Sequence, residues 1–74
     1  MGNHNALTVD VMVNGEPRPI ATDATLLDLL RTLALDPRMV VVEHNRRIVR
    51  RARLGDVHVA RGDTIELVHF VGGG

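Results

Sequence analysis

The stretch that decides the fold is residues 61–74, RGDTIELVHFVGGG. It opens with Arg61-Gly62-Asp63, which is typical of a turn because Gly and Asp tolerate turn geometry before a strand. Residues 64–71 then predict a final β-strand by their alternation. The alternation assigns Ile65 and Leu67 to the covered face of a sheet, with His69 on the same side as a partly buried, hydrogen-bonded residue. Three residues remain for the opposite face: Glu66, Val68 and Phe70.

Two apolar residues of this strand, Val68 and Phe70, fall on the face that no second helix is available to cover. Exposed apolar patches often mark partner sites, so we predict that Val68, Phe70 and the adjacent Val71 bind a partner. The alternative is that Phe70, the one aromatic residue in the sequence, packs around the sheet edge.

Upstream of this segment, the first element that the sequence predicts is a β-hairpin over residues 7–21. Residues 7–13 alternate in polarity, which predicts a half-buried strand. Asn14-Gly15 follows, a pair that tolerates positive φ in a two-residue turn. The returning arm, residues 16–21, contains two prolines, which cannot donate to a ladder, so we expect it at an edge of the sheet.

A single helix opens at Thr25 and stops before Pro37, since the residue preceding a proline avoids helical geometry. Thr25 and Asp28 have the spacing of a capping box, and Asp28 can pair with Arg31 one turn further on. Leucines at helical spacing form the buried face: Leu26, Leu29, Leu30 and Leu33.

The second half supplies more strands. Residues 39–43 are a β-branched run, which predicts a central strand buried on both faces. A turn at Asn45-Arg46 and a short strand at residues 48–49 follow. Residues 50–60 are irregular, with Leu54 and Val57 as core residues. Several strands and one helix must share one core, so the fold class is α+β.

The composition excludes several functions. The 74 residues include no Cys, Ser or Lys, which removes thiol and serine nucleophiles, thiolate metal sites and Schiff-base chemistry. Nine arginines balance nine acids, so we expect no nucleic-acid partner. The four histidines lack metal-ligand spacing, so no metal site is predicted. No signal peptide or membrane-length apolar run is visible, and we expect a cytoplasmic protein without membrane contact.

The three glycines at residues 72–74 predict a flexible tail. Without Cβ atoms, the tail can thread a narrow channel and bring the Gly74 carboxylate into another protein's active site. An ionised carboxylate is a poor electrophile and needs external activation. The tail is therefore a substrate and not a catalyst.

From about residue 7 to residue 74, the sequence resembles the ThiS family, the sulfur carrier proteins of thiamine biosynthesis in the ThiS/MoaD superfamily. That likeness implies a β-grasp (ubiquitin-like) domain over residues 7–71, with a four- to five-stranded mixed sheet on one α-helix. Residues 1–6 would be a disordered N-terminus and residues 72–74 the tail. The segments that carry the resemblance are residues 14–18, 24–30, 42–45, 48–51, 62–66 and 68–74.

The resemblance also implies a reaction. An E1-like adenylyltransferase (ThiF type) would use ATP and Mg²⁺ to adenylate the Gly74 carboxylate. A sulfur from a donor enzyme would displace AMP and leave a thiocarboxylate, which thiazole synthase (ThiG type) would accept. Gly72 and Gly73 would give access to the partner channels, and Val68 and Phe70 would lie on the partner-binding face. The chain itself would hold no cofactor and would not be an enzyme.

Three alternatives stay open. The same chemistry can serve molybdopterin, cysteine or secondary-metabolite synthesis. A ubiquitin-like protein modifier is a second possibility, although the absence of Lys excludes lysine-linked chains. The third is a non-covalent interaction domain with an inert tail.

The sequence departs from the family at one turn, in one basic cluster and at Phe70, which is bulkier than the small residue associated with that place. Arg46 stands where the family often has Gly, so the turn type is expected to differ. Five of the nine arginines fall within eight residues, where they either dock an acidic partner or a phosphate, or form a solvated edge: Arg46, Arg47, Arg50, Arg51 and Arg53.

Overall fold

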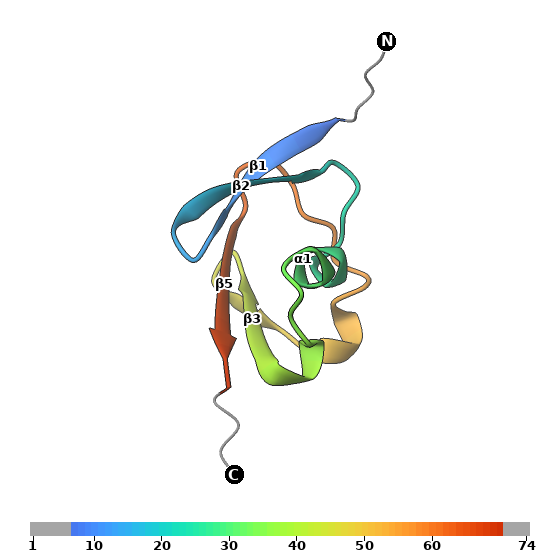
Figure 1. The fold of residues 1–74 in the computed structure, drawn as a ribbon, viewed down its shortest axis with the longest axis vertical. Helices are drawn as coiled ribbons and strands as arrows, with labels where there is room; N and C mark the ends of the chain where they lie inside the picture. The colour runs from blue at the N-terminus through green and yellow to red at the C-terminus, as the bar shows by residue number, and fades with distance from the viewer. Residues whose placement is uncertain (1–6, 71–74) are drawn as a thin grey trace.

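The computed structural model describes residues 7–70. In this part of the chain, five strands form one mixed sheet in the order β2-β1-β5-β3-β4, with a single α-helix on one face (Figure 1). The β1–β5 pair is parallel and the other pairs are antiparallel. This confirms the predicted α+β class. The elements are β1 (Thr8–Val13), β2 (Glu16–Ala21), α1 (Leu26–Thr32), the 3₁₀ helix η1 (Pro37–Met39), β3 (Val40–His44), β4 (Arg47–Val49), the 3₁₀ helix η2 (Arg51–Arg53) and β5 (Thr64–His69).

The β1–β2 hairpin turns at Asn14 and Gly15, whose φ angles of 50° and 84° are both positive. Asn and Gly tolerate this region, which is the reason why the pair forms a two-residue turn. The strand β2 carries Pro17 and Pro19 and lies at an edge of the sheet, as predicted.

Helix α1 begins with the predicted capping box. The Asp28 backbone N–H donates to Thr25 Oγ1 at 3.1 Å, and the Thr25 N–H donates to Asp28 Oδ2 at 2.9 Å. These bonds satisfy two of the donors that a helix start leaves free. On the exposed side of the helix, Arg31 Nη1 lies 3.9 Å from Asp28 Oδ1, so the two side chains pair as expected. The leucine stripe faces the core, with Leu33 only partly buried.

The core lies between α1 and the inner face of the sheet. Its largest fully buried side chains come from α1, from the segment after η2 and from the three inner strands: Leu26, Leu30, Leu54, Ile65, Val11 and Val42. Leu54 is 1% exposed and Val57 packs against the core, which confirms both as core residues.

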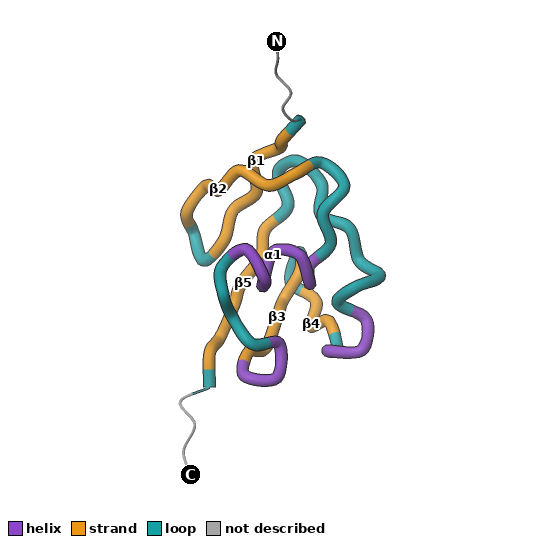
Figure 2. Tube along the Cα trace, turned by 45° about the vertical axis from the view of Figure 1, so that its right-hand side comes forward, coloured by secondary structure: helices purple, strands orange, loops and turns teal. Residues whose placement is uncertain are grey.

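The interpretation of residues 39–43 as a central strand buried on both faces was wrong in three respects. Met39 belongs to η1, and β5, not β3, is the central strand of the sheet. Val40 and Val42 of β3 are buried, but Val41 between them is only partly buried. The physical reason is that α1 covers only one face of the sheet (Figure 2). Side chains alternate between the two faces of a strand, so every second residue of β3 lies away from the core.

Candidate functional site

The outer face of β5 carries the apolar patch that the alternation predicts. Val68 is 60% exposed and Phe70 is 48% exposed. Val41 of β3 lies directly opposite Val68 in the sheet register, so it extends the patch sideways. We call Val41, Val68 and Phe70 the outer patch. Residues 71–74 lie outside the described residues, so the roles assigned to Val71, Gly72, Gly73 and Gly74 stay predictions.

Two acidic residues border the outer patch. Glu43 and Glu66 face each other across β3 and β5, and within residues 7–70 neither has an ion-pair partner. Like charges directly opposite each other in a sheet are destabilising. A partner that sets an arginine or lysine against this pair would relieve the repulsion, so the outer face combines an apolar contact with an acidic border.

The inner side of the same strand end is an open cleft of about 500 Å³. Leu33, Leu35 and Leu67 line it, and His69 stands at its rim. His69 is exposed, and among residues 7–70 no hydrogen bond reaches its ring. The prediction of a partly buried, hydrogen-bonded His69 was therefore wrong. The helix ends at Thr32 and leaves this end of β5 uncovered.

The hairpin turn holds the end of β5 in place. The Leu67 N–H donates to Asn14 Oδ1 at 2.7 Å, and Asn14 Nδ2 donates to the Leu67 carbonyl at 3.2 Å. The parallel β1–β5 pairing reaches only Val13 and Ile65, so the Asn14 amide extends it with side-chain bonds. Sequence reasoning treated Asn14 only as a turn residue, because a contact across 53 positions leaves no local pattern.

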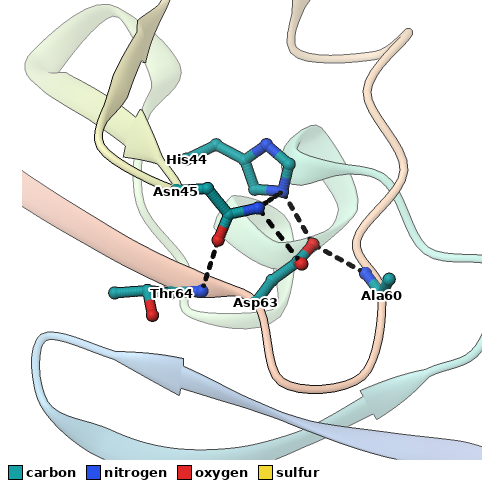
Figure 3. Close-up of polar contacts among 5 residues, drawn as sticks. All are labelled: His44, Asn45, Ala60, Asp63 and Thr64. Carbon is teal, nitrogen blue, oxygen red and sulfur yellow. Dashed lines mark hydrogen bonds and ion pairs between the residues drawn. The ribbon is translucent and has the colours of Figure 1, made fainter.

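A second polar network fixes the start of β5 (Figure 3). His44 Nε2 lies 2.7 Å from Asp63 Oδ2, and the Ala60 N–H donates to the same oxygen at 2.8 Å. Asn45 Nδ2 donates to Asp63 Oδ1 at 3.2 Å, and Asn45 Oδ1 accepts from the Thr64 N–H at 2.9 Å. The network ties the β3–β4 turn to the loop before β5.

This network perturbs the titration of Asp63. Burial raises the pKa of Asp63, but the hydrogen bonds from His44, the Ala60 N–H and the Asn45 amide outweigh burial and hold the pKa below its ordinary value. The network therefore has a structural role, because it joins the β3–β4 turn to the start of β5. Across residues 7–70, no three His, Asp or Glu side chains are placed to hold a metal ion.

The fold and the exposed strand end define the class of protein. A mixed five-stranded sheet with one helix across one face, as described here, is a β-grasp or ubiquitin-like domain. The chain belongs to the ThiS family, whose model matches residues 11–74. The part of the chain that the structure describes contains no helix long and apolar enough to cross a membrane.

Similar proteins agree with the family. The crystal structure of the thiamine biosynthesis protein ThiS from Geobacter metallireducens superposes with a TM-score of 0.76 at 30% identity, covering 89% of this chain and all of that one. The sulfur carrier protein ThiS of Bacillus subtilis is 44% identical over 50 residues, which are 68% of this chain and 76% of that protein. The thiazole synthase of Magnetococcus marinus is 42% identical over 64 residues, covering 86% of this chain. The chain spans only a fifth of the length of that synthase.

Proposed function

We propose that this protein is a sulfur carrier whose Gly74 carboxylate is converted into a thiocarboxylate. The observation that carries the proposal is the family match, which runs through residues 11–74 and so includes the three glycines. The similarity to the Bacillus subtilis sulfur carrier supports the same chemistry.

The chemistry must come from partner enzymes, because a carboxylate does not exchange oxygen for sulfur unaided. An adenylyltransferase with ATP and Mg²⁺ would join the Gly74 carboxylate to AMP and release pyrophosphate. A sulfur nucleophile from a donor enzyme would then displace AMP, which is a good leaving group. In this scheme the chain is a co-substrate: it holds no cofactor and contributes no catalytic side chain.

The acceptor of the sulfur is, in this proposal, a thiazole synthase. The support is that segments similar to this chain make up a fifth of proteins named thiazole synthase in Magnetococcus marinus and Paramagnetospirillum magneticum. A carrier-like segment and a synthase joined in one polypeptide indicate that the two act on each other, since fusion raises their effective concentration.

The described residues suggest how the tail is delivered. The outer patch and its acidic border would dock the adenylyltransferase, and the Asn14 amide would fix β5 three residues before Phe70. The glycines would then leave the domain from a defined point and enter the partner's channel. Asn14 is therefore a positioning residue in this scheme.

The test is ATP–pyrophosphate exchange by the cognate adenylyltransferase. We expect exchange with the intact chain, none with a chain lacking Gly73 and Gly74, and at least tenfold weaker exchange with Val68→Asp. Leu7→Ser removes another apolar side chain, which is 79% exposed and directly precedes β1, and serves as the matched control with unchanged exchange. Full exchange with the shortened, folded chain would overturn the proposal.

A further inference from the structure

The five arginines of residues 46–53 form a surface that sulfur transfer at the tail does not use. We call Arg46, Arg47, Arg50, Arg51 and Arg53 the arginine surface. This segment contains no acid, whereas the rest of the chain carries nine acids against four arginines. All five side chains are exposed. Within residues 7–70, the one ion pair to them joins Arg53 Nε and Asp56 Oδ2 at 3.4 Å, with both side chains 67% exposed. Such a pair is weak, so the surface keeps a concentrated positive charge.

The arginine surface adjoins a cleft of about 350 Å³, which lies between β4 and η2. Partly buried Val49 and Val57 line its apolar floor, and three arginines line its rim: Arg47, Arg50 and Arg53. A cleft that combines an apolar floor and a cationic rim suits acidic side chains, whose methylene groups can lie on the floor while their carboxylates meet the rim.

The strand beside the cleft has a free edge. Strand β4 pairs with β3 alone and ends the sheet (Figure 2). His44 and Arg47 flank the two-residue turn and are opposite each other, so these two residues exchange backbone hydrogen bonds. The next pair along the strands, Glu43 and Ile48, is then a non-hydrogen-bonded pair. The N–H and carbonyl of Ile48 therefore point to the open edge, ready to pair with an added strand. The Ile48 side chain is 69% exposed beside them.

We propose that β4 and the arginine surface dock an extended, acidic segment of a partner protein, which adds to the sheet as a sixth strand. Its backbone would pair with Ile48, and its apolar side chains would lie on the same face as the exposed Ile48 side chain. Its acidic side chains would point to the opposite face, which Arg47 and Val49 share, and would enter the cleft with their carboxylates at Arg47 and Arg50. Strand addition gives affinity through the backbone and specificity through alternate side chains. A lone phosphate would use the arginines but neither the apolar floor nor the free edge. This surface is separate from the outer patch and goes beyond the proposed sulfur chemistry.

The experiment titrates the full chain, labelled with ¹⁵N, with a synthetic seven-residue peptide of alternating glutamate and valine. We expect the largest amide shifts in residues 47–53. Arg47→Gln with Arg50→Gln should weaken binding by about tenfold. Raising the salt from about 0.05 M to about 0.5 M should weaken it several-fold, because the charges are exposed. Arg61→Gln, an exposed arginine in the turn before β5, is the matched control and should leave binding unchanged.

Further outcomes decide against the proposal. Equal affinity for a peptide in which prolines replace the valines would exclude strand addition, because proline cannot donate. Shifts centred on Val68 and Phe70 would move the peptide to the outer patch. Binding of tripolyphosphate without binding of the peptide would make the arginine surface a small-anion site. If the double variant loses its dispersed spectrum, Arg50→Gln alone provides the same comparison with a smaller effect.

Discussion

Arg46 occupies a backbone conformation that suits glycine. Its φ is +73°, next to Asn45 at +51°, and a side chain in this left-handed region costs roughly 1–2 kcal/mol. The sequence pattern predicted a different turn type because Arg replaces Gly, but both turn residues keep positive φ, as in the Asn14-Gly15 turn. The β3–β4 pairing and the Asn45 bonds to Asp63 and Thr64 hold the turn despite the strain.

We therefore predict that Arg46→Gly raises the free energy of unfolding by about 0.5–1 kcal/mol, since the relief of strain exceeds the entropy cost of glycine. Urea unfolding measures the change. Arg47→Gly is the matched control, because Arg47 lies in β4 and does not have a positive φ. This variant should lower the free energy of unfolding. A loss of stability in Arg46→Gly would mean that the arginine side chain contributes to the fold.

Asp63 predicts a pH dependence of stability. Its pKa in the folded chain is lower than its ordinary value of 3.8, so the unfolded chain binds a proton first as the pH falls. The contribution of Asp63 is then fully present above about pH 5 and is lost as the pH falls through 3.8 toward the lowered pKa. Asp63→Asn should remove this part of the acid-induced loss, which unfolding measurements from about pH 6 to pH 2 can follow.

The control for this prediction is Asp23→Asn, an exposed acid in the loop before α1 with no hydrogen bond to its carboxylate among the described residues. It should leave the acid-induced loss as it is. An unchanged pH profile in Asp63→Asn would contradict the assignment of the lowered pKa to the His44–Asn45–Ala60 network.

At this scale, the sequence predicted contacts that follow from local spacing. Thr25 and Asp28 are three residues apart, and the capping box formed as expected. The Asn14–Leu67 and His44–Asp63 contacts join residues 53 and 19 positions apart. Asn and Asp were recognised only as turn residues, because their long-range partners depend on which strands become neighbours.

Among the elements, α1 depends most on its first turn. It has only seven residues, which is too short for a helix to be stable alone, so its cap and its buried face must stabilise it together. Thr25→Ala should lower the free energy of unfolding by about 1 kcal/mol, because it removes the acceptor for the Asp28 N–H. Thr32→Ala at the exposed end of the helix is the control and should change stability by less than about 0.5 kcal/mol. Equal effects in urea unfolding would contradict the role of the capping box.

The elements were predicted more completely than their order in the sheet. Alternation and turn residues located the hairpin and the last strand, and the capping box located the start of the helix. The helix ends at Thr32, earlier than the stop before Pro37 that the sequence predicted, and Ala34 already has a positive φ of 59°. The β-branched run at residues 39–43 was taken as the centre because such runs are typical of strands buried on both faces. The central position belongs to β5, which pairs with both β1 and β3. The parallel β1–β5 pairing joins the two ends of the domain, and no local pattern in either strand encodes it.

At the scale of the whole molecule, three features occupy different parts of the fold. The side-chain hydrogen bonds of Asn14 and Asp63 hold β5 at two points, the outer patch is exposed on the face away from α1, and the arginine surface lies beside β4, which is an edge strand of the sheet (Figure 2). The sequence identified Val68 and Phe70 through alternation and predicted their exposure correctly. Their partner and the roles of Gly72, Gly73 and Gly74 rest on the family and stay predictions.

The central claim is that sulfur is carried on Gly74. The most direct measurement is the intact mass of the full chain after incubation with its adenylyltransferase, ATP, Mg²⁺ and a sulfur donor. The account predicts a mass increase equal to one oxygen-to-sulfur exchange, which fragmentation places on Gly74 and which is absent when ATP is omitted. An unchanged mass, with no AMP formed from ATP by a demonstrably active enzyme, would contradict it.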